Sequence, residues 1–183
     1  KSRKTAGWND ESYLDLYQSI YNEDGAFSPA TEVQEINTVW HDGPAAVSSN
    51  GKTIYFSRDS RVLKDYENDK GINTKFSQMY LYKATKANDK WSNIAQLPFN
   101  SKTYSVSNPS ISKDGKTLYF NSNMPGGIGG NDIWKVEIKE GDVYGTPENL
   151  GSKVNTEGNE QFPSITDDNV LYFSSSAKQG LGG

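Results

Sequence analysis

Residues 109–120 read PSISKDGKTLYF, and two closely similar phrases occur elsewhere in the chain. They are AAVSSNGKTIYF at 45–56 and PSITDDNVLYF at 163–173. Each copy is a short apolar segment, a polar turn and a second apolar segment that ends in Tyr-Phe. Asn50-Gly51 and Asp114-Gly115 are dipeptides that accept the positive φ angles of a tight hairpin turn. The phrase therefore predicts three copies of a two-stranded antiparallel hairpin.

A second pattern also occurs three times, in segments that begin at Asp15, Tyr80 and Asp132. In each segment the first residue is followed by an apolar residue and an aromatic residue. Each segment ends with a triplet of an apolar residue, an Asn and a hydroxyl residue. The triplets are Ile36-Asn37-Thr38, Phe99-Asn100-Ser101 and Val154-Asn155-Thr156. The two patterns alternate along the chain. Together they predict four short strands per repeat, A and B from the hairpin and C and D from the second pattern.

Four-stranded antiparallel units that recur about every 40–50 residues are typical of the blades of a β-propeller. The sequence therefore predicts an all-β fold, a partial β-propeller with about three blades' worth of strands. The alternative is a flat β-sandwich, which does not require such regular repetition. The predicted units are strands C and D at 1–42, whole blades at 43–106 and 107–160, and strands A and B at 161–183.

The predicted strands do not make a closed ring. Closed propellers have roughly 4–8 blades, so three cannot close alone, and the first and last units would keep unpaired strand edges. We expect this chain to be part of a ring of about six to eight blades. The remaining blades would come from the same longer chain, which we favour, or from a second copy.

The composition excludes several classes of protein. Aromatic residues make up 12% of the 183 residues and glycine is frequent, which disfavours both disorder and a helical bundle. A net charge of −4 without a basic cluster gives no reason to expect nucleic acid as a partner. The absence of cysteine rules out disulfides and thiolate metal sites. No apolar stretch approaches the roughly 18 residues of a membrane span, so we expect no direct membrane insertion. We also expect no cofactor, because no motif in the sequence indicates one.

Residues 97–134 and 150–183 resemble the TolB-like, WD40-like propeller repeats of OmpA-family proteins from Bacteroidetes. The resemblance implies a periplasmic, outer-membrane-associated protein with protein partners there. PorE-like members of this family belong to the type IX secretion and gliding machinery. In the family an Asp precedes strand C. Asp15 and Asp132 match it, whereas Tyr80 stands at this position in the middle repeat.

The segment before Asp132 is rich in glycine. Its glycines are Gly126, Gly127, Gly129 and Gly130. A dinucleotide-binding loop would open a helix, but this segment leads into a predicted strand, so we expect a structural loop. The glycines would let the loop turn tightly against the neighbouring blade. The Asp132 carboxylate would accept hydrogen bonds from backbone N–H groups, as turn Asp residues do, and Asp15 would have the same structural role.

Two further segments could suggest a metal site. Residues 65–71 alternate acidic side chains as a calcium loop does, but the glycine falls one place late and Phe76 stands where the last ligand belongs. We expect a solvated insertion there. His41 is the single histidine, so no second imidazole can share a metal with it. The sequence predicts no metal site. It also contains no Ser-His-Asp arrangement that would indicate a nucleophile.

A four-stranded blade places its B–C and D–A loops on one face, and these loops vary most in length here. Binding residues concentrate on variable loops of a rigid scaffold, and aromatic side chains often anchor protein interfaces. The candidates for partner binding are Trp8, Trp40, His41, Tyr66 and Tyr104. We expect a non-enzymatic scaffold for a protein partner. The alternative is a carbohydrate-binding or hydrolytic propeller with its site at the central channel.

Overall fold

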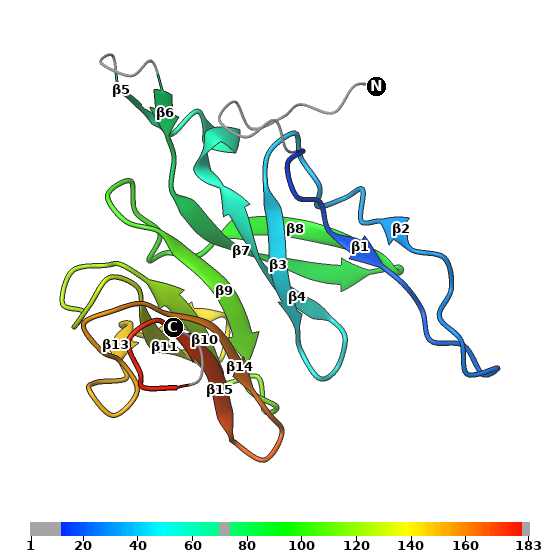
Figure 1. The fold of residues 1–183 in the computed structure, drawn as a ribbon. Coiled ribbons are helices and arrows are strands. Elements are labelled where there is room, and N and C mark those ends of the chain that lie inside the picture. The colour runs from blue at the N-terminus through cyan, green and yellow to red at the C-terminus, as the bar shows by residue number, and fades with distance from the viewer. Residues whose placement is uncertain (1–11, 70–73, 181–183) are drawn as a thin grey trace.

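The computed structural model of the chain describes residues 12–69 and 74–180 (Figure 1). Within these ranges every sheet is antiparallel, and the helical structure is one short 3-10 turn. The all-β prediction is therefore confirmed. The sheets follow the sequence repeats along the chain, with two larger sheets in the middle and a two-stranded sheet at each end.

The second and third sheets each contain a complete repeat. The strands of the second sheet, in spatial order, are β3 (Asp42–Val47), β4 (Thr53–Asp59), β7 (Met79–Ala87) and β8 (Lys90–Gln96). The strands of the third sheet are β9 (Val106–Ile111), β10 (Thr117–Ser122), β11 (Asp132–Lys139), β12 (Val143–Tyr144) and β13 (Glu148–Asn149). Both sheets have the strand order that the repeat predicts.

The last strand of the third sheet differs from the expected single strand D. It is split into β12 and β13, and each of these pairs separately with β11. Pro147 lies between them and has no N–H to donate to the ladder, so the pairing is interrupted there.

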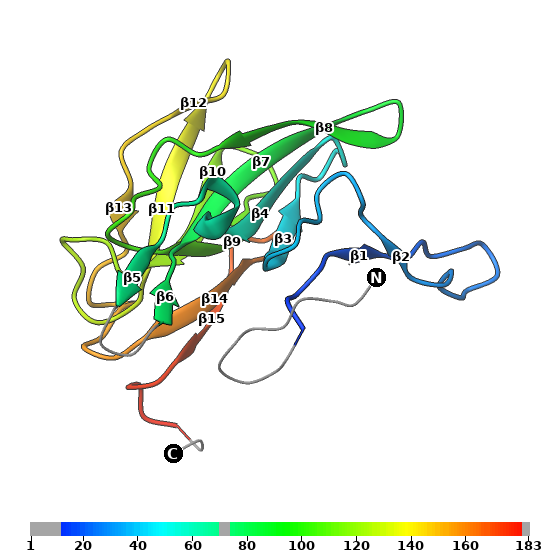
Figure 2. The same ribbon diagram turned by 90° about the horizontal axis from the view of Figure 1, so that it is seen from above.

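The two outer sheets are two-stranded. The first consists of β1 (Tyr17–Gln18) and β2 (Thr31–Glu32), and the last of β14 (Glu160–Ile165) and β15 (Leu171–Ser175). The hairpin that contains β1 and β2 extends away from the other sheets, at the right of Figures 1 and 2. By the repeat, β1 and β2 correspond to strands C and D, and β14 and β15 to strands A and B.

The connection from β4 to β7 contains structure that the sequence did not predict. The 3-10 turn (Ser60–Leu63) follows β4, and a small hairpin of β5 (Glu67–Asp69) and β6 (Thr74–Phe76) extends beyond it (Figure 2). The Asp59 side chain caps the 3-10 turn by accepting a hydrogen bond from the Arg61 N–H at 2.8 Å.

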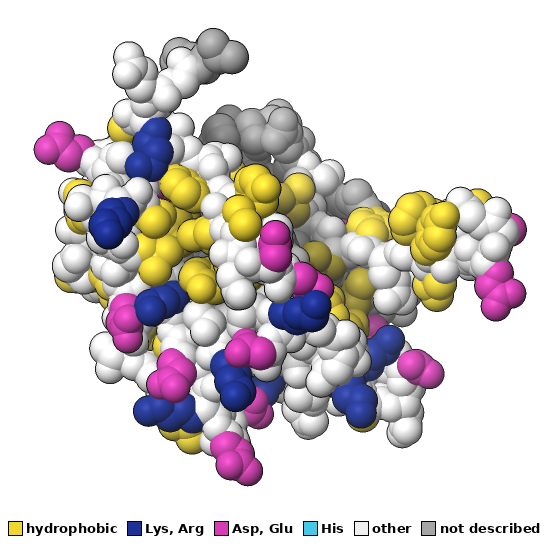
Figure 3. All heavy atoms as spheres, turned by 90° about the horizontal axis from the view of Figure 1, so that it is seen from below, with side chains coloured by type: hydrophobic (Ala, Val, Ile, Leu, Met, Phe, Trp, Pro, Cys, Tyr) yellow, Lys and Arg dark blue, Asp and Glu magenta, His cyan; other side chains and the backbone are white. Residues whose placement is uncertain are grey.

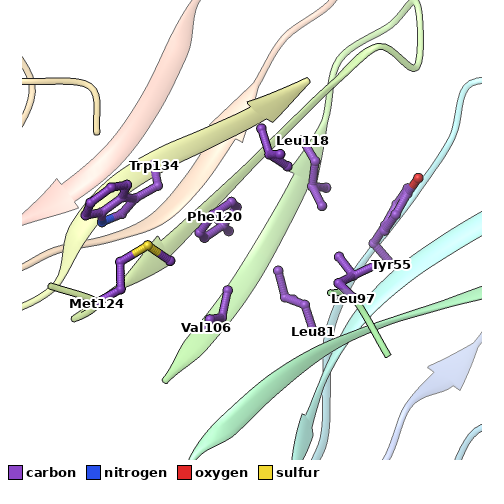
Figure 4. Close-up of a cluster of buried hydrophobic side chains, with 9 residues drawn as sticks. Tyr55, Leu81, Leu97, Val106, Leu118, Phe120, Met124 and Trp134 are labelled. Atoms are coloured by element: carbon purple, nitrogen blue, oxygen red, sulfur yellow. The ribbon is translucent and has the colours of Figure 1, made fainter. Parts of the chain in front are cut away.

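The Tyr-Phe pair places its two rings on opposite faces of the sheet, as alternation along a strand requires. Tyr55 packs at one end of a cluster between the second and third sheets, and Trp134 of the third sheet lies at the other end, with Phe120 between them (Figure 4). Phe56 packs on the other face, in a cluster with Val33 and Tyr82. These rings fill the spaces between neighbouring sheets, as the sequence predicts.

The first strand of each hairpin bends at a proline. Gly43, Asn108 and Phe162 each precede a proline and have a positive φ, of 108°, 54° and 55° respectively. The pairing register shifts at the same place in all three strands, which is a β-bulge. These three strands, β3, β9 and β14, lie next to one another and line a common groove.

Candidate partner-binding face

An ion pair lies beneath the loops at the start of β3. The Asp42 carboxylate accepts hydrogen bonds from the Thr38 N–H at 2.6 Å and the Thr38 hydroxyl at 2.7 Å, and it pairs with Arg58 Nε at 2.6 Å. Both charged side chains are buried. The Arg58 guanidinium also lies 4.9 Å from the ring centroids of Phe56 and Tyr82. The pair therefore fixes the connection into β3 as a rigid base for the loops above it.

The last sheet contains a related arrangement, in which Glu160 replaces Asp42 and Ser175 stands at the position of Arg58. The Glu160 carboxylate accepts hydrogen bonds from the Thr156 N–H at 2.8 Å, the Thr156 hydroxyl at 2.7 Å and the Ser175 hydroxyl at 2.5 Å. Burial alone would raise the pKa of Glu160, but the hydrogen bonds from Ser175 and Thr156 outweigh it and lower the pKa. In the third sheet Val106 takes the corresponding place in the strand pairing and packs into the core.

Above the Asp42–Arg58 pair, four side chains from three separate segments form an aromatic–arginine cluster. The cluster consists of Tyr13, Trp40, His41 and Arg61. The Tyr13 ring packs edge-on against Trp40 at 5.3 Å and against His41 at 4.7 Å. The Arg61 guanidinium lies 5.4 Å from the Trp40 ring centroid and donates a hydrogen bond to the Tyr13 hydroxyl at 3.2 Å. All four side chains are half-buried.

His41 has a structural role within this cluster. Its Nδ1 accepts a hydrogen bond from the Leu14 N–H at 3.1 Å, so that nitrogen carries no proton. Burial lowers the pKa of His41 from its ordinary value of 6.5, and Arg61 adds to this, although Asp59 opposes it. The neutral imidazole therefore joins the chain entering the first sheet to the start of the second.

The other predicted binding residues lie elsewhere. The Tyr104 hydroxyl donates to the Phe99 carbonyl at 3.1 Å, and its ring packs against the core, so Tyr104 packs beneath its own loop. Tyr66 is half-buried in the connection between β4 and β7. Trp8 lies outside the described residues. The structure thus brings together two of the predicted residues, Trp40 and His41.

Sequence reasoning missed Tyr13 and Arg61, which complete the cluster. No repeat pattern includes either residue, and each joins the cluster across a long separation in sequence. The available signal was chemical, because arginine and tyrosine are the residue types that most often anchor interfaces together with tryptophan.

The end of the 65–71 segment lies outside the described residues, whereas Asp65 lies within them. Its carboxylate accepts a hydrogen bond from the Tyr80 hydroxyl at 2.6 Å and pairs with Lys102 at 3.4 Å. Burial, and then the hydrogen bond to Asp65, raises the pKa of Tyr80 well above its ordinary value. Tyr80, which stands where the other two repeats have Asp15 and Asp132, therefore contacts a carboxylate from the β4–β7 connection. Among the described residues, no three His, Asp or Glu side chains are grouped as metal ligands.

The glycine-rich loop before β11 packs closely on the connection into the last sheet. A Cβ atom at Gly129 would overlap the carbonyl oxygens of Thr156 and Gly158, and one at Gly130 would lie 2.5 Å from Asn159 Oδ1. The Gly130 N–H donates to the Gly158 carbonyl at 2.8 Å. Glycine is therefore required here for close contact between two backbone segments.

The remaining glycines of this loop serve its own shape. Gly126 has a φ of 93°, and a Cβ atom at Gly127 would collide with the Asp132 carboxylate. That carboxylate accepts the expected backbone hydrogen bonds, from the Ile128 N–H at 2.5 Å and the Gly129 N–H at 3.3 Å. Asp15, the corresponding residue of the first repeat, is half-buried directly before Leu16.

The groove between β3, β9 and β14 contains no catalytic arrangement among the described residues. Small and proline side chains dominate its lining, and Asp167 is the only carboxylate that lines it. Asp167 pairs with Lys113 at 3.1 Å, and both side chains are largely exposed.

Comparison with known proteins gives no assignment: no family model matches the chain, and no curated protein is significantly similar to it. Within residues 12–69 and 74–180 there is no helix with the length and apolar character needed to cross a bilayer.

Proposed function

We propose that this chain is part of a β-propeller that acts as a non-enzymatic scaffold and binds a protein partner on the face that carries the aromatic–arginine cluster. The observation that carries the propeller interpretation is the convergence of β3, β9 and β14, the first strands of three successive repeats, on one groove. In a propeller the first strand of each blade lines the central channel. The second and third sheets, whose strands follow the same order, also support it.

The lining of this groove favours a scaffold over an enzyme or a carbohydrate-binding propeller. Ligand pockets combine apolar walls with a few polar groups that converge on the ligand. Here most of the lining side chains are small or are prolines, and the two charged side chains, Lys113 and Asp167, pair with each other. The resemblance to OmpA-family proteins suggests that the scaffold works in the periplasm at the outer membrane, within a secretion or gliding complex.

The aromatic–arginine cluster is the best candidate for the contact with the partner. Trp, Tyr and Arg carry most of the binding energy in protein interfaces, and hot spots sit where such side chains are supported by their neighbours. Trp40 is held from one side by Tyr13 and covered by Arg61. A rigid, half-buried aromatic of this kind loses little conformational entropy on binding.

A matched pair of tryptophan variants tests this proposal. Trp91 is also half-buried and also has a cation near its ring, Lys86 Nζ at 5.7 Å, but it lies in the β7–β8 hairpin. Wild type, Trp40→Ala and Trp91→Ala would be immobilised and exposed to a periplasmic extract from a Bacteroidetes bacterium. The proposal predicts a protein that wild type and Trp91→Ala retain and Trp40→Ala loses. Equal retention by all three, or no specific retention, would contradict it.

A further inference from the structure

The turn between β3 and β4 contains Asn50-Gly51, which is the only Asn-Gly dipeptide in the chain. This dipeptide is chemically reactive, because glycine carries no side chain to hinder the attack of its backbone nitrogen on the asparagine amide. Both residues are exposed, and a Cβ atom at Gly51 would meet nothing beyond the adjacent residues within 4 Å. The reactive dipeptide is therefore open to solvent.

Ser48 holds both reacting groups of this dipeptide. The Gly51 N–H donates a hydrogen bond to the Ser48 carbonyl at 2.8 Å. Asn50 Oδ1 accepts hydrogen bonds from the Ser48 hydroxyl at 2.8 Å and from the Lys52 N–H at 2.9 Å. The Ser48 hydroxyl is itself held, because it accepts the Thr53 N–H at 3.0 Å. The amide and the attacking nitrogen are thus both fixed in the folded turn.

The equivalent turn of the next repeat has an acid in place of the amide. Asp114 Oδ1 accepts hydrogen bonds from the Ser112 hydroxyl at 2.6 Å and from the Lys116 N–H at 3.0 Å. Gly115 has a φ of 71°, close to the 68° of Gly51, and its N–H donates to the Ser112 carbonyl at 2.9 Å. The Ser112 hydroxyl, and then the Lys116 N–H, lower the pKa of Asp114, which favours the charged carboxylate. The same turn therefore accepts an aspartate without rearrangement.

We propose that Asn50 is a deamidation site, that Ser48 keeps it unreactive in the folded turn, and that its aspartate product fits the same turn. In the reaction the Gly51 nitrogen gives up its proton and bonds to Asn50 Cγ. The bond from Cγ to Nδ2 breaks, and Nδ2 leaves with a proton as ammonia. Water then opens the resulting succinimide ring, either at Cγ to give aspartate or at the backbone carbonyl to give isoaspartate.

The turn distinguishes the two products. An aspartate leaves the main chain unchanged, and its carboxylate can accept the hydrogen bonds that Asp114 accepts. Isoaspartate adds a carbon to the main chain, which moves the Gly51 N–H away from the Ser48 carbonyl. Figure 3 views the molecule from the side on which the β3–β4 and β14–β15 connections lie, and lysine and acidic side chains are spread over this face. The charge of the aspartate product is therefore added to a face that is already charged and solvated.

Peptide mass spectrometry tests the proposal, because deamidation converts an amide into an acid of slightly higher mass. Wild type, Ser48→Ala and Ser112→Ala would be incubated at mildly alkaline pH, both folded and in guanidinium chloride, and the conversion of Asn50 would be followed with time. Ser112→Ala is the matched control, since it removes the equivalent hydroxyl from the Asp114 turn. Circular dichroism checks that each variant is folded before incubation.

We expect Asn50 to convert at least about tenfold faster in the unfolded wild-type chain than in the folded one, because the folded turn must break its hydrogen bonds before it reacts. Folded Ser48→Ala should convert at least about threefold faster than folded wild type or Ser112→Ala. Asn22, which is also exposed but precedes Glu23, should convert slowly in every sample. Equal rates in the folded and unfolded chains, or equal rates for the two serine variants, would overturn the proposal.

Asn50→Asp reproduces the aspartate product and tests its fit to the turn. Its melting temperature should lie within about 2 °C of wild type, and a larger fall would show that the turn does not accept the product. These measurements do not involve the aromatic–arginine cluster, so their outcome is independent of the proposed function.

Discussion

Asn155 binds both backbone polar groups of Ile133. Its Oδ1 accepts the Ile133 N–H at 2.8 Å, and its Nδ2 donates to the Ile133 carbonyl at 3.0 Å. Asn37 makes the same two bonds to Leu16, and Asn100 makes them to Leu81. The asparagine of each triplet thus acts as an extra strand residue, because its amide satisfies the backbone of strand C beyond the end of strand D.

Replacing Asn155 with alanine should destabilise the chain by about 1–3 kcal/mol, because it leaves the buried Ile133 N–H without its partner. The Ile133 carbonyl loses one hydrogen bond but keeps the one from the Leu150 N–H at 3.2 Å. Asn22→Ala, at an exposed position, should change the stability by less than about 0.5 kcal/mol. Urea unfolding followed by tryptophan fluorescence measures both. Similar stability for the two variants would show that the Asn155 bonds contribute little.

Removing Asp42 should be more costly than removing an exposed acid. Asp42→Ala leaves the buried Arg58 charge without its partner, and we expect a loss of about 3–5 kcal/mol. Glu148 pairs with Lys135 at 3.3 Å with both side chains well exposed, so Glu148→Ala should cost less than about 1 kcal/mol. The difference between the two unfolding free energies is the result to compare. A loss at Asp42 no larger than that at Glu148 would argue against a rigid base beneath the loops.

Glu160 should make the stability depend on pH in the acid range. Its pKa in the folded state is below the ordinary value of 4.5, so its charged form stabilises the fold above that value. The contribution is lost as the pH falls through the folded-state pKa. Glu160→Gln should therefore be less stable than wild type near neutral pH, and the gap should narrow as the pH falls below about 4.

Denaturant titrations of both proteins at several pH values would measure this gap. The two proteins share all other carboxylates, and the glutamine side chain does not titrate. The pH dependence of the difference in their stability therefore reports on Glu160 alone. A gap that is constant with pH, or that widens in acid, would contradict the assigned role of the Ser175 and Thr156 hydrogen bonds.

Gly129 lies in close contact with a second backbone segment, whereas Gly145 has room for a Cβ atom. Gly129→Ala should destabilise the chain by about 1–3 kcal/mol, because the new Cβ atom forces apart the glycine-rich loop and the 156–158 connection. Gly145 offers a matched control, since a Cβ atom there would meet its nearest neighbour at an ordinary 3.6 Å. Thermal unfolding of both variants measures the difference. If Gly129→Ala were as stable as Gly145→Ala, the loop would not be packed as described.

The repeat made much of the fold predictable from sequence. The Tyr-Phe phrase located β4, β10 and β15, and strand alternation correctly assigned its two rings to opposite faces. The asparagine triplets were also visible as a pattern. Their role was not, because a side-chain bond to a backbone about 20 residues away leaves no periodic signal.

The candidate site was only partly predictable. Trp40 and His41 are adjacent in sequence and were identified by residue type, whereas Tyr13 and Arg61 reach them only through the fold. The residue at the start of strand A is Asp42 in one repeat, Val106 in the next and Glu160 in the last. Because the residue type is not repeated, the sequence pattern did not indicate a buried acid there. The hairpin of β5 and β6 interrupts one repeat alone, and repetition cannot predict such an insertion.

The central claim is that the aromatic–arginine cluster binds a protein partner. The most direct measurement is the retention of periplasmic protein by immobilised wild type, Trp40→Ala and Trp91→Ala chains. The account predicts a protein that wild type and Trp91→Ala retain and Trp40→Ala loses. Equal retention by all three chains would contradict it.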